Sequence, residues 1–448
     1  MINFSNKINN NYDFLEQAIH QGLTFSKNKV DDIEITIIKN IGINVNTRFK
    51  KILNIEFNND LSFFVTVFLK NSKGSAMSTD LNIKSIKDTI NYAINIAKYT
   101  SRDKYNKLPD KSFLAFKKKR LKIFYPWYFD VNYAVNLTKS TEDYALKYDK
   151  KIVNTEGANF SANNLVKFFA NSSGMLNYYN NTNYFLSNSV IAKDSSGMQT
   201  DYYYSSSRNI LDLESAKNVG IKSSKKAISK LSPRKIKTMK YPVIFSSDIS
   251  YTLFSHLSQA IYGENVYSNS TFLINKLNKK IFPKWLSIYE KPHINKGLGS
   301  IPFDNEGVYT KNINIINKGV LSTWLLDNYS ANKLNLFTTG HSGGISNWLV
   351  KSSKKISFKN LLYKMNEGLL ITDLIGESVN IVNGDYSRGA SGFFVKNGKI
   401  MFPVHEITIS DNLINIFNNI FDMSNDFNTN KKIISGSILI KEINVSGY

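Results

Sequence analysis

The sequence contains no cysteine among its 448 residues. Disulfides, thiolate metal ligands and a cysteine nucleophile are therefore excluded. A chain without disulfides suits a reducing compartment, so we expect a cytoplasmic protein. Any metal site would have to combine carboxylates with the five histidines, which are His20, His256, His293, His341 and His405.

Long hydrophobic runs are also lacking. No stretch approaches the roughly 18 consecutive apolar residues of a transmembrane helix. Residues 1–7 lack the basic and apolar regions of a secretory signal. We therefore expect neither a membrane-spanning segment nor a membrane partner.

Arginine is scarce, although the formal net charge is +22. Lysine supplies nearly all of the positive charge, because arginine occurs at six positions only: Arg48, Arg102, Arg120, Arg208, Arg234 and Arg388. Basic surfaces bind nucleic acid by releasing counterions, but arginine is preferred for bidentate contacts to bases and phosphates. Lysine, asparagine and isoleucine are all favoured by A/T-rich codons. Base composition explains the charge more simply than a nucleic-acid partner does.

Hydrophobic periodicity divides the chain into three blocks. Residues 1–112 combine predicted helices at 12–27 and 83–98 with short strands. Those strands are predicted at 33–38, 43–49, 52–57 and 61–69, and a cap for the second helix at 78–80. Residues 113–231 begin with a basic linker that carries Lys117–Arg120, a run typical of a solvated face.

The middle block continues with predicted helices at 130–149 and 212–230 around short strands. Across the first two blocks, Asn-, Asp- and Gly-containing turns are predicted at 58–60, 73–74, 154–157, 171–174, 180–183 and 194–197. Residues 232–448 open with a strand at 243–245 and a helix at 248–262. Short strands and glycine-rich turns follow, which favours an antiparallel sheet or barrel. The predicted fold class is α+β, with two helix-plus-antiparallel-sheet domains followed by a mainly β, barrel-like domain.

The histidines do not form a recognisable zinc motif. A helical zinc protease needs two histidines on one helix face with a glutamate between them. His256 lies in a predicted helix without a second histidine on its face. His405 and Glu406 begin like such a motif, but the surrounding residues alternate as a strand, which would place the two side chains on opposite faces. We therefore expect no metal ligands in this chain.

Two glycine-rich segments are the other candidates for chemistry. His341 lies in Thr339-Gly340-His341-Ser342-Gly343, where it is either a hydrogen-bonded loop residue or an acid–base group. Residues 384–392 contain Asp385 and Arg388 among small residues. This run is either a loop that another backbone approaches, with Asp385 and Arg388 as a charged clamp, or a tight turn between core strands 380–382 and 393–395 with a local Asp–Arg pair. His341, Asp385, Arg388, His405 and Glu406 are thus the candidates for a cleft.

Several segments resemble the PmbA/TldE branch of the TldD/PmbA metallopeptidase family. Residues 383–393, followed by Phe402-Pro403-Val404-His405-Glu406-Ile407, are similar to its C-terminal signature. Residues 231–235, 242–245, 266–273 and 339–345 match further positions, as do 73–81 and 154–157 upstream. The resemblance covers roughly residues 15–448. It implies that helix 254–263 stands where the TldD branch holds zinc, with Ser255, Ser258 and Gln259 in place of ligands.

This resemblance implies a role in a complex. A TldD-type partner would supply zinc and the activated water, while this chain, inactive alone, would shape the cleft for a peptide or small unfolded protein. The alternatives are a peptide-binding or regulatory scaffold without a share in catalysis, a nucleic-acid-associated modulator, and an autonomous peptidase that uses His341 or His405.

Overall fold

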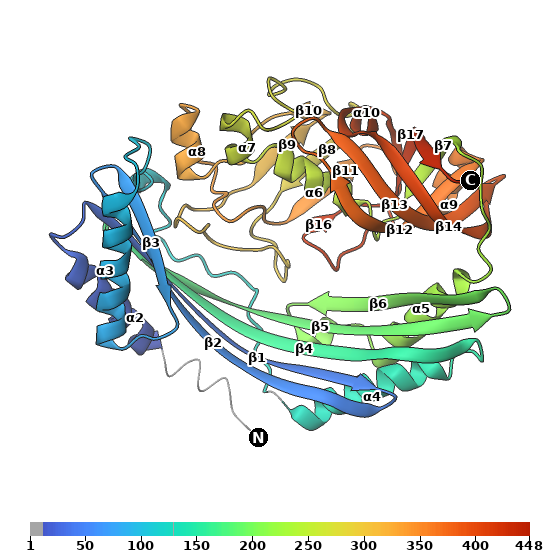
Figure 1. Cartoon of the computed structure of the whole chain (residues 1–448), viewed down its shortest axis with the longest axis horizontal. Helices are drawn as coiled ribbons and strands as arrows, with labels where there is room; N and C mark the ends of the chain where they lie inside the picture. Colours follow the sequence, from blue (N-terminus) through green and yellow to red (C-terminus); the bar gives the residue numbers. More distant parts are fainter. Residues whose placement is uncertain (1–11, 129) are drawn as a thin grey trace.

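A long curved sheet and a smaller group of strands face each other in the computed structural model, which describes residues 12–128 and 130–448 (Figure 1). Residues 1–7, for which no signal sequence is predicted, lie outside the described residues. Antiparallel sheets and separate helices build both units, so the predicted α+β fold class is confirmed. No described helix has both the length and the apolar character needed to cross a membrane.

The first unit is one antiparallel sheet in the order β3-β2-β1-β4-β5-β6. Its strands are β1 (Asp32–Arg48), β2 (Lys51–Leu69), β3 (Ser72–Ser78), β4 (Ile152–Asn171), β5 (Leu176–Asp194) and β6 (Gly197–Ser207). β1 pairs with both β2 and β4. The predicted blocks 1–112 and 113–231 therefore contribute strands to the same sheet, while the boundaries between the blocks remain a prediction.

The strands are longer than the sequence predicted. The separate runs predicted at 33–38 and 43–49 are parts of β1, and those at 52–57 and 61–69 are parts of β2. The turns predicted at 58–60, 73–74, 154–157 and 180–183 are wrong, because these residues lie within strands. The turns at 171–174 and 194–197 are confirmed. The unpredicted turns use Phe49-Lys50 and Lys70-Asn71, all with positive φ, a backbone shape that suits tight hairpins.

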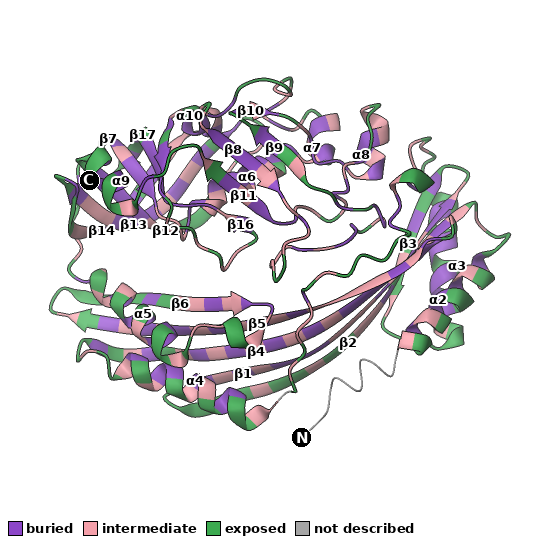
Figure 2. Ribbon diagram, turned by 180° about the vertical axis from the view of Figure 1, so that it is seen from behind, coloured by how far each residue is buried: buried purple, intermediate pink, exposed green. Residues whose placement is uncertain are grey.

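Helices cover the convex face of this sheet (Figures 1 and 2). α2 (Tyr12–Ser26) and α3 (Ile83–Tyr99) cover one end, and α4 (Val131–Leu146) and α5 (Ala216–Ser229) cover the other. All four agree with predicted helices to within a few residues. α3 begins at Asn82, whose side chain accepts a hydrogen bond from the Ser85 N–H at 2.7 Å, so the cap predicted at 78–80 lies slightly too early.

The concave face of the sheet is polar and remains uncovered by these helices. Asparagines from neighbouring strands bind one another there, since the Asn159 amide donates to Asn44 at 2.6 Å and to Asn46 at 2.7 Å. Aromatic rings lie toward the β6 edge, where Phe185 and Tyr204 stack at 5.4 Å. This amide pairing explains why asparagine-rich stretches, read as turns from sequence, form strand interiors instead.

The second unit contains a closed barrel. Its strands are β7 (Met239–Phe245), β12 (Gly368–Val379), β13 (Asp385–Lys396), β14 (Lys399–Asn412) and β17 (Ile438–Ser446). The barrel closes because β17 pairs with both β7 and β14. The predicted barrel-like region is confirmed, although β7 runs parallel to β12. β15 (Ile420–Met423) pairs with β17 at its margin.

A further sheet and several short helices pack beside the barrel around a large shared core. The sheet has the order β10-β9-β8-β11-β16. Its strands are β8 (Leu286–Glu290), β9 (Ile313–Asn317), β10 (Val320–Leu321), β11 (Trp348–Ser352) and β16 (Ile433–Ile434). The helices are α6 (Tyr251–Ala260), α7 (Gly263–Tyr267), α8 (Asn328–Lys333), α9 (Phe358–Met365) and α10 (Leu413–Asn418). Single 3₁₀ turns occur at Lys111–Phe113 and Ile210–Asp212.

The segment after residue 113 ties the two units together. Leu114 forms a bridge with Val308, and the Ala115 N–H donates to the Gly307 carbonyl at 2.9 Å. Within this linker the basic run 117–120 is exposed, which agrees with a solvated face. The Lys118 ammonium lies 3.3 Å from the centre of the Tyr178 ring.

Candidate functional site

Helix α6 carries the positions at which the family resemblance expects metal ligands. Leu253, Leu257 and Ala260 anchor the helix in the core. Ser255 and Ser258 are partly buried, and the Ser258 hydroxyl donates to the Ser255 carbonyl at 2.8 Å. Gln259 is exposed. Helix α6 therefore offers hydroxyl and amide groups at these positions.

His256 is the imidazole of this helix, and it is buried. Its side chain lies edge-on to Tyr386, with ring centroids 6.0 Å apart and an interplanar angle of 71°. Neither ring nitrogen has a hydrogen-bond partner within the described part of the chain. Burial, assisted by the positive charge of Arg388, lowers the pKa of His256 to about 4. His256 is therefore neutral at neutral pH.

Tyr386 of β13 contacts this histidine, and the charge of Arg388 on the same strand acts on it. They are two residues apart on the strand and therefore share its inner face. Tyr386 is 1% exposed and Arg388 is 7% exposed. Among residues 12–128 and 130–448, the Tyr386 hydroxyl and the Arg388 Nε find no hydrogen-bond partner, and no carboxylate pairs with the guanidinium. Burial raises the pKa of Tyr386 above its ordinary range, although the charge of Arg388 opposes this.

We call His256, Tyr386 and Arg388 the arginine pocket. We call the side of the pocket at Tyr251, at the start of α6, its mouth, because Tyr251 is only partly buried and lies close to β6: the Lys431 ammonium is 3.6 Å from the centre of the Tyr251 ring and 5.9 Å from that of Tyr204. Tyr204 belongs to β6, so this mouth lies on the side of the second unit that faces the curved sheet. Glu377 is the exposed carboxylate whose charge reaches both His256 and Tyr251.

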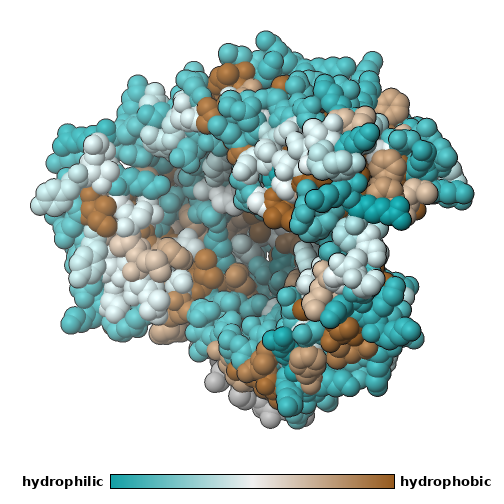
Figure 3. Space-filling model, turned by 45° about the vertical axis from the view of Figure 1, so that its right-hand side comes forward, coloured by the Kyte–Doolittle hydropathy of each residue, from teal (hydrophilic) through white to brown (hydrophobic). Residues whose placement is uncertain are grey.

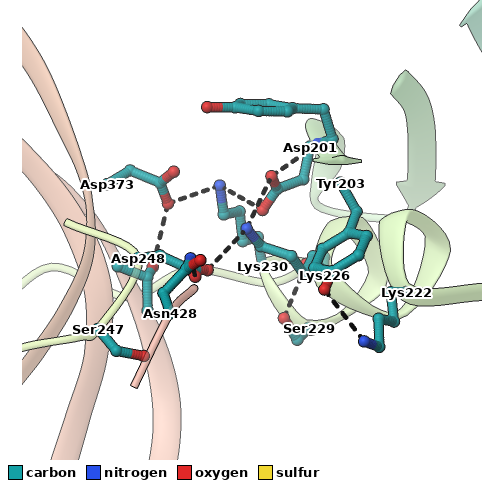
Figure 4. A network of polar contacts seen from close by, with 12 residues as sticks. Asp201, Tyr203, Lys222, Lys226, Ser229, Lys230, Ser247, Asp248, Asp373 and Asn428 are labelled. Carbon is teal, nitrogen blue, oxygen red and sulfur yellow. Dashed lines mark hydrogen bonds and ion pairs between the residues drawn. The ribbon is translucent and has the colours of Figure 1, made fainter. Parts of the chain in front are cut away.

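A charged network joins the two units close to this mouth (Figure 4). The ammonium of Lys230, the residue after α5, lies 2.7 Å from Asp201 of β6 and 2.7 Å from Asp373 of β12. Lys226 bridges Asp201 at 3.7 Å and Asp248, just before α6, at 3.3 Å. Asp201 is almost fully buried. These ion pairs fix the position of α6 and β12 relative to the β6 edge.

A hollow lies on the concave side of the sheet, and Figure 3 shows the gap between the two units from the side. The hollow has a volume of about 540 Å³. Its lining combines amide and hydroxyl groups with two aromatic rings, and includes Asn46, Asn159, Ser187, Ser189, Phe185 and Tyr202. Such a surface can bind the polar backbone of an extended chain through hydrogen bonds.

His341 is bound in a different place and in a different way. Its Nε2 lies 2.6 Å from Glu290 Oε2, and its Nδ1 lies 2.8 Å from the Thr339 hydroxyl. Glu290 also accepts from the Ser346 N–H at 2.5 Å and from the Ser346 hydroxyl at 2.6 Å. Burial would raise the pKa of Glu290, but donation from His341 and Ser346 outweighs it and holds the pKa below its ordinary value. We call His341, Glu290, Thr339 and Ser346 the histidine cluster.

The residues at 384–392 form a strand rather than a loop. The predicted turn is misplaced and the strand predicted at 380–382 is wrong, because the turn occupies 380–384 and β13 begins at Asp385; the strand predicted at 393–395 is confirmed as part of β13. Gly392 permits this strand, since a Cβ there would lie 2.0 Å from the Leu370 carbonyl oxygen. Asp385 is exposed and accepts from the Asn383 amide at 2.7 Å, whereas Arg388 is buried. The predicted Asp–Arg pair is therefore not formed among the described residues.

His405 and Glu406 lie in β14, as the alternation predicts, but at a β-bulge. Ala390 pairs with Ile407 and Gly392 with Val404, so both His405 and Glu406 oppose Ser391. Glu406 has a φ of 55°. Val404 and Ile407 are both buried, which leaves His405 partly exposed and Glu406 exposed between them. The strict alternation that would put the two on opposite faces is interrupted.

The arginine pocket does not fit a zinc ion. Zinc needs three or four imidazole, thiolate or carboxylate ligands, and α6 offers one imidazole. The guanidinium of Arg388 adds a positive charge beside it. Within the described ranges, no group of three or more histidine, aspartate or glutamate side chains could hold a metal ion.

Comparison with known proteins defines the class of this chain. The model of the PmbA/TldA metallopeptidase central domain matches residues 124–231, and that of the C-terminal domain matches residues 238–447. The chain is 49% identical over 441 residues to the metalloprotease PmbA homolog of Buchnera aphidicola subsp. Acyrthosiphon pisum, which spans 98% of this chain and 99% of the relative. It is 45% identical to metalloprotease PmbA of Escherichia coli O157:H7, over 97% of this chain and 96% of the relative. The chain belongs to the PmbA/TldD metallopeptidase family.

Solved structures share the whole fold. A candidate modulator of DNA gyrase from Bacteroides thetaiotaomicron superposes with a TM-score of 0.91 at 25% identity, over 98% of this chain and 100% of that chain. TldE from Thermococcus kodakarensis superposes with a TM-score of 0.81 at 19% identity, over 96% and 100%. The arrangement of curved sheet and barrel is therefore a property of the fold.

Of the residues predicted as cleft candidates, the structure brings Arg388 alone together with α6. Sequence reasoning treated His256 as a lone helical histidine and passed over Tyr386. The signal available was the alternation of Tyr386, Arg388 and Ala390, which places two large polar side chains on one strand face within a run rich in small residues.

Proposed function

We propose that this chain is the metal-free subunit of a cytoplasmic two-chain peptidase. A TldD-type partner would hold the zinc and supply the activated water, and this chain would shape the cleft and hold the peptide. The observation that carries the proposal is the chemistry of α6, where hydroxyls, an amide and a neutral imidazole lie beside an arginine. The family membership and the polar hollow on the concave sheet support it.

In this proposal the chain contributes binding and orientation. An extended peptide would lie along the polar concave face, where amide side chains can bind its backbone and Phe185 and Tyr202 can contact its side chains. The ion-pair network of Lys226 and Lys230 would keep the two walls of the cleft at a fixed separation.

Metal counting with separated and mixed chains tests the proposal. We expect stoichiometric zinc on the TldD-type partner and none on this chain, with peptide cleavage only after the two are mixed. A mixture treated with a chelator is the control. One tightly held zinc and peptide cleavage in this chain alone would overturn the proposal. Unchanged activity of the partner when this chain is omitted would favour the alternative of a binding or regulatory scaffold.

A further inference from the structure

The arginine pocket contains an unusual set of unpaired groups. Arg388, Tyr386 and His256 are each more than nine-tenths buried. The Arg388 Nε, the Tyr386 hydroxyl and both nitrogens of His256 lack hydrogen-bond partners among the described residues. Buried polar groups in proteins are nearly always paired, and a buried ion without a counter-charge is especially unfavourable. Tyr386 is in ring contact with His256 and shares a strand face with Arg388, and a set of unpaired groups so placed is a sign of a missing ligand.

We infer that the arginine pocket of this chain binds a carboxylate group of a peptide. The guanidinium can donate two parallel N–H groups to the two carboxylate oxygens, and the Tyr386 hydroxyl can donate a third hydrogen bond. A neutral imidazole can donate one more through its protonated nitrogen. The inference rests on the proposed function, in which this chain holds the peptide.

The charge of the pocket favours a monoanion. Arg388 provides one positive charge, and the exposed Glu377 adds a negative charge near the mouth. A carboxylate balances the single charge of the guanidinium, whereas a phosphate with two negative charges would keep one unbalanced charge and be repelled more strongly by Glu377. A metal cation would be repelled by Arg388. The polar groups also belong to a helix and a strand that are both fixed in the core, so the site is organised before the ligand arrives.

The pocket is placed to receive the end or a side chain of a chain bound in the cleft. Its mouth at Tyr251 lies toward β6, because Lys431 lies over the rings of both Tyr251 and Tyr204, and Tyr202 of the same strand lines the hollow on the concave face. The two possible sources of a carboxylate are the C-terminus of a peptide and an aspartate or glutamate side chain. Both present the same two oxygens, so a binding experiment must separate them.

Calorimetry with the isolated full-length chain tests the inference. The probes are N-acetyl-Ala-Ala-Ala with a free carboxylate, the same peptide with a C-terminal amide, and N-acetyl-Ala-Asp-Ala with a C-terminal amide. We expect the free acid to bind on the order of tenfold or more tightly than its amide, because only the acid fills the pocket with charge. Equal binding of the acid and of the aspartyl amide would identify a site for any carboxylate, and preference for the free acid would identify a C-terminal site.

Substitutions locate the preference. Arg388→Gln should abolish the difference between acid and amide, and Tyr386→Phe should reduce it about threefold through loss of one hydrogen bond. Arg388→Lys should give an intermediate preference for the acid, since lysine keeps the positive charge but lacks the two parallel N–H donors of the guanidinium. Arg234→Gln is the matched control, because Arg234 is exposed and stacks on Phe402. If Arg388→Gln does not fold, Arg388→Lys and Tyr386→Phe still give the comparison.

Two results would overturn the inference. One is equal affinity of the unsubstituted chain for the acid and for both amides. The other is an acid preference that survives in Arg388→Gln or, failing that variant, is unchanged in both Arg388→Lys and Tyr386→Phe. Neither partner nor zinc takes part in the measurement, so an inactive mixture would count against the proposed function and leave this inference standing, and the reverse also holds.

Discussion

The histidine cluster and the arginine pocket are two buried polar sites in the same unit with opposite hydrogen-bonding states. Glu290 and His341 find partners for both carboxylate oxygens and both ring nitrogens. In the arginine pocket, the Arg388 Nε, the Tyr386 hydroxyl and both ring nitrogens of His256 find no hydrogen-bond partner within the described residues. Buried polar groups that satisfy one another stabilise a fold, whereas those left unsatisfied lower stability and are retained for a ligand. The difference assigns structure to the first site and binding to the second.

The largest expected effect comes from breaking the satisfied site. Glu290→Ala should lower the free energy of unfolding by about 3–5 kcal/mol, because His341 and Ser346 would keep buried donors without an acceptor. Urea denaturation measures the change. Arg234→Gln, an exposed substitution in the same unit, should stay within about 0.5 kcal/mol. A loss below about 1 kcal/mol in Glu290→Ala would remove the structural assignment.

The next largest effect is expected at Lys230, a cation that, unlike Arg388, has carboxylate partners. Lys230→Gln should cost about 2–4 kcal/mol, because Lys226 at 3.7 Å would be the one cation left beside the buried Asp201 among the described residues. Urea denaturation measures this loss of stability. Limited proteolysis of the connection between the two units would show whether the substitution also lets the units move apart. If the variant were as stable and as resistant to proteolysis as the unsubstituted chain, the ion pairs of Lys230 would contribute nothing that water molecules could not replace.

Arg388→Gln should change stability in the opposite direction. Removing an unpaired buried charge while keeping a similar volume should leave the free energy of unfolding unchanged or raise it by about 1 kcal/mol. The same urea experiment measures it. A loss comparable to that of Glu290→Ala would show that Arg388 is a structural residue, and the contrast between the two sites would disappear.

The smallest effect is a pH dependence from His256. Its folded pKa of about 4 lies below the ordinary value of 6.5, so its contribution to stability is complete above pH 6.5 and is lost as the pH falls toward 4. At pH 5.5 the loss should be about 1 kcal/mol, and it should be absent in His256→Phe. In Arg388→Gln, NMR titration should find the His256 pKa raised toward 6.5, because one cause of its depression is gone. An unshifted pKa there would mean that burial acts alone.

The sequence predicted the helices better than the strands. Leu15, Ile19 and Leu23 repeat at helical spacing, and α2 forms where they indicate. The long strands were missed because asparagines within them resemble turn residues, and the amide contacts between Asn44, Asn46 and Asn159 exist only across strands far apart in sequence. Local patterns cannot express such pairings.

The candidate site was predictable only in part. The absence of cysteine and the lack of a histidine pair on α6 could be read directly from the sequence, because both depend only on which residues are present and not on tertiary contacts. That Arg388 is buried and Asp385 exposed depends on where β13 begins, which the glycine-rich run concealed. The partners of His341 lie at Glu290 and Ser346, and no spacing rule connects them.

The order in which strands join the barrel has a consequence for biosynthesis. The curved sheet is assembled mostly from consecutive hairpins, so its pairings can form soon after each strand leaves the ribosome. β7 instead pairs with β12 and β17, which are synthesised much later, and the barrel cannot close until β17, the last strand of the chain, has been made. A chain paused before β17 would therefore present a finished sheet beside an open barrel wall, and chaperones would meet that wall first.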